Sequence, residues 1–134
     1  MADFVHLTNK TEYSLSEGAL PIARIAELCQ SFSMPAVGIS DNNNMFGALE
    51  FSEQIAKVGV QPILGCNIKI KTPKEYLHEN IEDNDLYFYL NIFSKSNEGY
   101  ENLLKCVSNA YTLNKGNAYV TIDDLIKFKE GLII

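Results

Sequence analysis

The sequence predicts an α/β domain whose strands run mostly parallel to one another. Short apolar segments alternate with longer segments in which apolar residues recur at helical spacing. The connections are short, and 46% of the 134 residues are hydrophobic, which is enough for one buried core. Because ligands bind at the carboxyl ends of parallel strands, the residues that follow each predicted strand are the candidates for a functional site.

The first half of the chain is expected to contain three strands and two helices. The strands are residues 4–8, 36–39 and 62–71, each rich in apolar side chains. Pro21 opens the first helix, and a second helix, after the middle strand, stops near Gly59. Proline favours the first turn of a helix and glycine favours its end.

The second half begins with a charged segment. Residues 74–85 carry five acidic side chains and predict a solvated loop with one helical turn. Residues 86–93 are dense in aromatic and branched side chains, which favour a strand. The helix after this strand has a predicted buried stripe of Tyr100, Leu103, Leu104, Val107 and Tyr111.

The last elements are a capped helix and the start of a strand. Thr121 offers an N-cap with Asp124 three residues on, and Gly131 offers the helix stop. Residues 132–134 then begin a strand that would expose apolar surface and unpaired backbone groups. We therefore expect this chain to be part of a longer protein, and by itself to dimerise, swap elements or cover the open edge with a rearranged segment.

Charge and composition exclude several classes of function. The chain has 11 basic and 17 acidic residues, a net charge of -6, so no direct contact with nucleic acid is expected. No apolar run reaches the roughly 20 residues needed to span a bilayer, and no signal peptide is visible, which predicts a cytoplasmic protein without a membrane contact. Cys29, Cys66 and Cys106 form no Cys-x-x-Cys pair and are interpreted as buried small hydrophobes, with a reactive thiol as the alternative.

Polar residues follow the predicted strands at the ends where ligands would bind. The second strand is followed by Asp41 and three consecutive asparagines. One of these asparagines is expected to cap the next helix, because an asparagine side-chain oxygen accepts well from free backbone amides. The other candidates are Thr8, Asn9 and Lys10 after the first strand, Asn67 on the third and Tyr89 on the fourth.

Four segments carry a family resemblance, in order and with matching spacing. They are FVHLTNKTEYSLSEG (residues 4–18), MPAVGISDNNNMFGALEF (34–51), QPILGCNIKI (61–70) and NEGYENLLKCVSNAY (97–111). Together they resemble the N-terminal polymerase and histidinol phosphatase (PHP) domains of bacterial replicative DNA polymerase III alpha subunits. The resemblance implies a distorted, TIM-like (β/α)7 barrel, of which residues 1–134 would be about the first half. The polymerase palm, fingers and thumb would lie outside this chain.

The resemblance also identifies positions of a metal site. Active members of the family hold a trinuclear metal centre with histidine and carboxylate ligands, whereas the matching residues here are mostly poor ligands. A threonine hydroxyl binds divalent ions weakly, and a lysine ammonium has no free lone pair. The matching positions are Thr8, Lys10, Glu17, Asp41, Asn42, Asn67 and Tyr89, of which only Glu17 and Asp41 are acids.

These losses predict a degenerate pocket that needs no metal and no other cofactor. Lys10 would then pair with Asp41 or Glu17 where the metals would stand, or else point to solvent. The expected function is a structural and docking module of the polymerase subunit, with the rest of that subunit and the proofreading exonuclease as partners. The alternative is a metal-dependent 3′-5′ exonuclease or phosphoesterase, as in family members with intact ligands.

Overall fold

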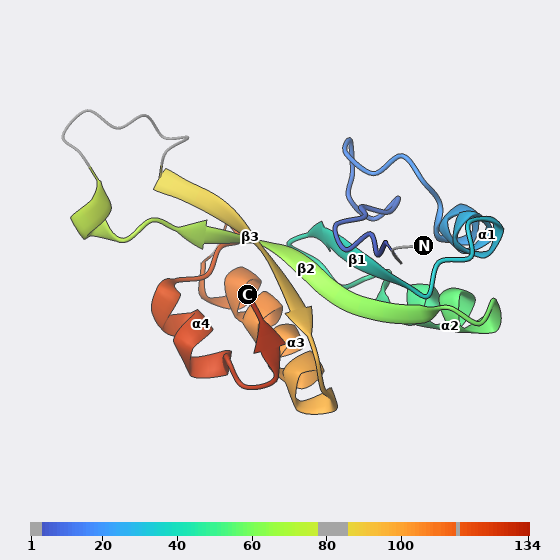
Figure 1. Ribbon diagram of the computed structural model, residues 1–134. Helices are drawn as coiled ribbons and strands as arrows, with labels where there is room; N and C mark the ends of the chain where they lie inside the picture. The colour runs from blue at the N-terminus through green and yellow to red at the C-terminus, as the bar shows by residue number, and fades with distance from the viewer. Residues whose placement is uncertain (1–3, 78–85, 115) are drawn as a thin grey trace.

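The computed structural model describes residues 4–77, 86–114 and 116–134. In this part of the chain, four strands form one sheet in the order β1-β2-β3-β4 (Figure 1). β1 and β2 run parallel, whereas β3 is antiparallel to β2 and β4 is antiparallel to β3. The strands are β1 (Ala36–Asn42), β2 (Gln61–Lys71), β3 (Tyr87–Ser94) and β4 (Leu132–Ile133).

The described helices form two groups along the sheet (Figure 1). α1 and α2 share a core with Val37 and Ile39 of β1. α3 and α4 pack on β2 and β3, where Leu103 and Leu125 meet Ile68. None of the described helices is long and apolar enough to cross a membrane. The helices are α1 (Ile22–Ser31), α2 (Ala48–Lys57), α3 (Asn97–Leu113) and α4 (Ile122–Phe128), with one 3-10 turn, η1 (Lys74–Tyr76), after β2.

Alternation along the strands leaves one face of the sheet without a described helix. Ile68 and Ile70 of β2 are fully buried in the core that they share with α3 and α4. Lys69 lies between them and therefore points to the opposite face. Asn67 belongs to the same face as Lys69, as does Tyr89, which is the partner of Lys69 on β3. The helix-free face is therefore polar at these positions.

The α/β class is confirmed, but the prediction of a mostly parallel sheet is wrong. β1 and β2 are parallel because α2 lies between them in the sequence and returns the chain to the same end. A parallel return from β2 to β3 would need a crossover, usually a helix, and the described part of that connection holds only η1. β3 therefore runs back antiparallel. α3 and α4, two helices in succession, then bring β4 in opposite to β3.

The strand predicted at residues 4–8 is not formed, because this segment makes too few backbone hydrogen bonds with β1. Its backbone nevertheless follows β1: the His6 carbonyl accepts a hydrogen bond from the Gly38 amide at 2.7 Å, and Asn9 forms an isolated bridge. Gly38 allows the close approach, since a Cβ atom there would lie 2.5 Å from the Leu7 carbonyl oxygen.

The buried stripe of α3 differs from the predicted one. Leu103 is fully buried as predicted, but Cys106 and Ala110 complete the contact with the sheet. Leu104 and Tyr111 are 37% and 52% exposed. The helix thus turns its smaller side chains inward, which lets it lie close to β2 and β3.

The predictions of where the last helix begins and ends are confirmed. Thr121 and Asp124 form the predicted capping box: the Thr121 hydroxyl accepts from the Asp124 amide at 3.2 Å, and the Asp124 carboxylate accepts from the Thr121 amide at 2.9 Å. α4 ends at Phe128, and Gly131, with φ of 72°, lies in the turn into β4. The predicted loop after β2 does contain one helical turn, η1, and its residues 78–85 lie outside the described part.

The cysteines are buried and free, as predicted for small hydrophobes. Cys66 and Cys106 are fully buried in the core under β2 and β3. Burial raises the pKa of each of these two thiols to about 12, and it also raises the pKa of the Cys29 thiol. All three therefore stay protonated at neutral pH, which argues against the reactive-thiol alternative.

Candidate functional site at the strand ends

The carboxyl end of β1 places Asn42 opposite Asn67, which lies within β2 before that strand ends at Lys71. Asn42 and Asn67 are partners in the strand register, and Asn67 Nδ2 donates to Asn42 Oδ1 at 3.2 Å. The Oδ1 atom of Asn67 is buried and has no hydrogen-bond partner among the described residues. Amide side chains thus occupy the edge where the strand-end rule predicted a site.

Asp41 lies one residue before Asn42, on the other face of β1, and is only 1% exposed. Its Oδ1 atom accepts from the Thr11 amide at 2.7 Å and from the Ser14 hydroxyl at 2.6 Å. Its Oδ2 atom accepts from the Thr11 hydroxyl at 2.7 Å. A buried carboxylate is tolerated only where such donors replace water. Three neutral donors from one loop therefore hold this charge.

Lys10 forms an ion pair with Glu17, near Asn42. The Lys10 and Glu17 side chains remain 28% and 55% exposed. The hydrogen bond from Lys10 is the main reason why the pKa of Glu17 lies below its ordinary value, and a hydrogen bond from the Asn42 side chain adds to the effect. Of the two partners predicted for Lys10, the structure shows Glu17, while Asp41 takes hydroxyl and amide donors instead.

Asn43 and Asn44 tie the turn after β1 to its surroundings. Asn43 has φ of 50°, in the left-handed region that asparagine tolerates better than most residues. Its Oδ1 atom accepts from the Lys69 amide at 2.8 Å, and its Nδ2 atom donates to the Ala118 carbonyl at 3.2 Å. Asn44 Nδ2 donates to the Tyr13 carbonyl at 3.1 Å. These side chains supply the hydrogen bonds that a backbone ladder would otherwise make.

The prediction that one of these asparagines caps α2 is wrong. The N-cap of α2 is Gly47, and no side chain accepts a hydrogen bond there. Asn44 Oδ1 instead accepts from the Phe46 amide at 3.2 Å, two residues further on, as in an Asx turn. Because Met45 and Phe46 intervene, the asparagines lie too far along the chain to reach the first turn of the helix.

Two predicted positions lie apart from this cluster. Thr8 is exposed and makes no side-chain hydrogen bond within the described residues. Tyr89 is 53% exposed and lies two residues along β3 from Asn91, the residue level with Asn67. Since β3 is antiparallel, its carboxyl end does not coincide with those of β1 and β2, so the strand-end rule does not apply to Tyr89.

Sequence reasoning missed four residues around the site. Asn91 accepts a hydrogen bond from Ser40 Oγ, and it is the only amide side chain among residues 86–93, a usable signal. The Tyr111 hydroxyl donates to the Asn43 carbonyl at 2.9 Å, although its spacing predicts a core residue. The other two are Thr11 and Ser14, which no pattern distinguishes from ordinary loop residues.

The two acids at these strand ends already have partners within the described chain. The carboxylate of Asp41 already accepts three hydrogen bonds, and Glu17 is paired with a lysine, whose ammonium repels a cation. The asparagine amides carry no charge, whereas clusters of divalent ions need several carboxylates and imidazoles. In the described part of the chain, no three His, Cys, Asp or Glu side chains gather where they could hold one ion.

The fold and the strand-end cluster can be compared with known proteins. The family model of the PHP domain matches residues 6–134. The chain belongs to the PHP domain family. This confirms the family predicted from the four sequence segments.

Relatives of this PHP domain include polymerase subunits. The DNA polymerase III subunit alpha of Rickettsia felis is 37% identical over 133 residues, which cover 98% of this chain and 10% of the relative. The subunit of the same name from Haemophilus influenzae is 30% identical over 132 residues, 98% of this chain and 11% of the relative. The chain therefore spans about a tenth of the length of these relatives.

A solved structure shows the same fold. It comes from Bifidobacterium adolescentis and is described as a candidate metal-dependent phosphoesterase. It superposes on 82% of this PHP domain with a TM-score of 0.58 and 18% identity, and the matched region is 34% of that chain. At this identity the likeness concerns the fold alone.

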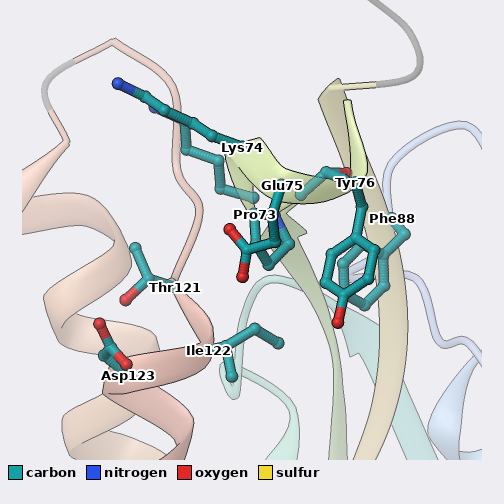
Figure 2. A pocket seen from close by; sticks show the side chains of 10 residues that line it. Pro73, Lys74, Glu75, Tyr76, Phe88, Thr121, Ile122 and Asp123 are labelled. Carbon is teal, nitrogen blue, oxygen red and sulfur yellow. The ribbon is translucent and has the colours of Figure 1, made fainter. Parts of the chain in front are cut away.

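A cavity of about 660 Å³ lies away from the strand-end cluster (Figure 2). It is formed by the end of β2, η1 and the start of α4. Figure 2 shows the rings of Tyr76 and Phe88 on one side of this cavity and Thr121 and Asp123 on the other. Lys71 also lines it. The volume falls within the range of small-molecule sites, about 300–1,000 Å³.

Proposed function

We propose that this PHP domain is a structural and docking module of a bacterial DNA polymerase III alpha subunit and has no hydrolytic activity of its own. The names of its relatives support the assignment to this polymerase, because they match nearly the whole chain. The longer protein would be a DNA-directed DNA polymerase that acts in DNA replication. The chain would contribute its folded surface to that protein.

The observation that carries this proposal is the state of Asp41. In a metal site its carboxylate would bind the ions, but here Thr11 and Ser14 supply three hydrogen bonds to it. The second acid, Glu17, is neutralised by Lys10. Both carboxylates thus have internal partners, so the pocket is stable without a cation.

We also propose that the sheet is the first half of a distorted (β/α)7 barrel. Two features support this architecture: the parallel β1–α2–β2 unit and the sheet face without a described helix. The solved relative is about three times longer than its matched region, since 34% of that chain is covered. Later residues of the longer protein would then line the helix-free face.

Metal analysis of the purified chain tests the metal-free pocket. After equilibration with zinc or manganese followed by dialysis, we expect no stoichiometric metal to remain. Asp41→Asn, shown to be folded by circular dichroism under the conditions of the assay, serves as the matched variant, because it removes a carboxylate that any strand-end metal would need. Stoichiometric metal in the chain, lost in Asp41→Asn, would overturn the proposal.

A second function, a metal-dependent 3′-5′ exonuclease or phosphoesterase, is favoured only by the description of the solved relative. It predicts metal-stimulated release of nucleotides from a labelled oligonucleotide. We expect none above the level of the Asp41→Asn variant. Hydrolysis that depends on both manganese and Asp41 would favour this second function.

The docking role has its own experiment. The longer subunit would be copurified with the proofreading exonuclease subunit, with and without residues 1–134. We expect deletion to weaken the association, provided that the shortened subunit remains soluble and folded by circular dichroism. An unchanged association would leave the domain with a structural role only.

A further inference from the structure

Strongly exposed apolar side chains gather beside the start of α2. We refer to Leu15, Phe46 and Leu49 as the apolar rim; they are 87%, 75% and 70% exposed. Tyr13 links the N-terminal loop to this end of α2, because a Cβ atom at Gly47 would lie 2.9 Å from its ring. Leu15 is two residues from Tyr13, and Phe46 is next to Gly47. The three apolar side chains therefore belong to one region of the surface.

Buried neighbours hold these side chains in their exposed positions. Ser14, which precedes Leu15, is 2% exposed, and its hydroxyl donates to Asp41 at 2.6 Å. The Phe46 amide donates to Asn44 Oδ1 at 3.2 Å, and Asn44 is 6% exposed. A side chain that is already fixed loses little conformational freedom when a partner covers it. The apolar rim is thus preorganised for a contact.

Completion of the proposed barrel would leave the apolar rim uncovered. Later barrel residues would line the helix-free face, whereas α2 packs on the opposite face of the sheet. The helices on either side of α2 are already present: α1 shares its core, and α3 packs on β2 and β3 (Figure 1). The matched region is 34% of the solved relative, but the chain matches only 10% of the Rickettsia felis subunit. Most of such a subunit would therefore lie beyond a barrel of that length.

Acidic side chains border the apolar rim. Glu12, Glu50 and Glu53 are all exposed. Glu50 follows Leu49 directly, and Glu53 lies one helical turn further along the same face of α2. A contact of the rim with itself in a second copy of the chain would bring these carboxylates together, which is unfavourable. A surface of apolar side chains bordered by basic ones would instead be complementary.

We propose that the apolar rim docks on a later part of the same longer polymerase chain, against apolar side chains bordered by lysine or arginine. Exposed apolar surface of this kind needs cover at all times, and a part of the same chain supplies it without a separate binding step. The relatives extend far beyond the matched region and leave ample chain for this contact. The inference rests on the proposed function, because it takes the chain as part of that subunit. It names one surface through which the domain would dock.

Hydroxyl-radical footprinting, read by mass spectrometry, tests the proposal on the unaltered protein. The oxidation rates of Leu15 and Phe46 are compared between the isolated chain and the full-length subunit. We expect oxidation to be about fivefold slower in the full-length subunit, since side chains at the centre of an interface lose almost all contact with solvent. Tyr76, which is 71% exposed beside the other cavity, is the control and should react alike in both proteins. Unchanged rates at the rim, or equal protection of Tyr76, would overturn the proposal.

A charge variant tests the acidic border separately. In the full-length subunit, Glu53→Lys should raise the oxidation rate of Phe46 roughly threefold, because a lysine would then face the basic border of the partner surface. Glu101→Lys is the matched control: Glu101 is also exposed on a helix, and the change in charge is equal, so the rate should stay the same. Circular dichroism would verify that both variants are folded. No effect of Glu53→Lys, or an equal effect of both substitutions, would overturn the proposal.

Two further measurements separate the proposed occupant of the rim from other occupants. Protection of the rim in the isolated chain that grows with its concentration would assign the rim to a second copy. Protection of the full-length subunit that appears only after addition of the proofreading exonuclease subunit would assign the rim to a separate protein. Either outcome would overturn the proposal. None of these results bears on the metal-free pocket, which metal analysis tests independently.

Discussion

At the residue scale, Asp41 joins the N-terminal loop to the first strand. It is the most deeply buried charge of the strand-end cluster, and it depends on three short hydrogen bonds from Thr11 and Ser14. Hydrogen bonds to a charged group contribute more than those between neutral groups, and a buried donor without its acceptor is costly. The residue that the strand-end rule selects for chemistry therefore has a structural role.

This role predicts a large effect of replacing Asp41 with asparagine. The asparagine amide keeps the shape of the carboxylate but turns an NH₂ group toward the donors of Thr11 and Ser14. The free energy of unfolding should therefore fall by about 3 kcal/mol. Urea unfolding followed by circular dichroism measures the change. Glu53→Gln, an exposed position on α2, is the matched control and should alter stability by less than about 0.5 kcal/mol. Equal stability of the two variants would contradict the structural role.

The Lys10–Glu17 pair predicts a weak dependence of stability on pH. Because Lys10 lowers the pKa of Glu17, the pair stabilises the fold fully above the ordinary value of 4.5 and loses this effect as the pH falls through the lowered value. Glu17→Gln should therefore lower the melting temperature slightly at pH 7 and not at pH about 2. The pair is exposed, so high salt should also remove the difference. A difference that persists in acid would contradict this origin.

At the scale of elements, local signals and long-range pairing differ in how well a sequence predicts them. The capping box of Thr121 and Asp124 depends on neighbours in the chain, and it was predictable for that reason. The direction of β3 depends on how the chain returns after β2, which no residue of β3 encodes. The edge contact of residues 4–8 likewise depends on Gly38, some thirty positions away.

The residues of the candidate site also differ in how well the sequence predicts them. The pairing of Asn42 with Asn67 was predictable, because both follow apolar strand segments and parallel strands share their carboxyl ends. The partners of Asp41 come from a loop with no periodic pattern, so only the folded chain shows them. Asn91 lay within reach of prediction, since one amide in an apolar strand needs a polar neighbour.

The cap of α4 gives a prediction at this scale. Thr121→Ala removes the acceptor for the Asp124 amide and should lower the free energy of unfolding by about 1 kcal/mol. Thr121→Ser keeps the hydroxyl and is the matched control. Thermal unfolding by calorimetry measures both variants. If alanine and serine behave alike, the hydroxyl has no capping role.

At the scale of the whole molecule, net charge and local charge lead to different expectations. A net charge of -6 predicts no nucleic-acid contact, yet Lys69 and Lys71 lie together among tyrosines on one face. Electrostatic attraction acts within a Debye length of about 8–10 Å at physiological salt, so a distant acid on another face matters little. The net charge of the chain therefore does not describe the local charge around Lys69 and Lys71.

The expected self-association of the chain can be tested at the same scale. Phe32 is 70% exposed and Leu20 is 39% exposed, and both line an apolar cavity of about 240 Å³ beside α1. His6 lines the same cavity, and its ring contacts that of Phe4, which is 65% exposed. Apolar surface gathered in this way is typical of an interface, and we expect it to be buried between two copies of the chain.

Sedimentation equilibrium over a range of concentrations should therefore show a rise in average mass toward that of a dimer. Phe32→Ser should weaken dimerisation about tenfold, because covering one aromatic side chain contributes about 1.5–3 kcal/mol. Tyr76→Ser is the matched control: Tyr76 is 71% exposed but lies beside the other cavity, so its loss should leave the association unchanged. A constant monomer mass at every concentration would contradict the prediction. Equal weakening by both variants would place the contact elsewhere on the surface.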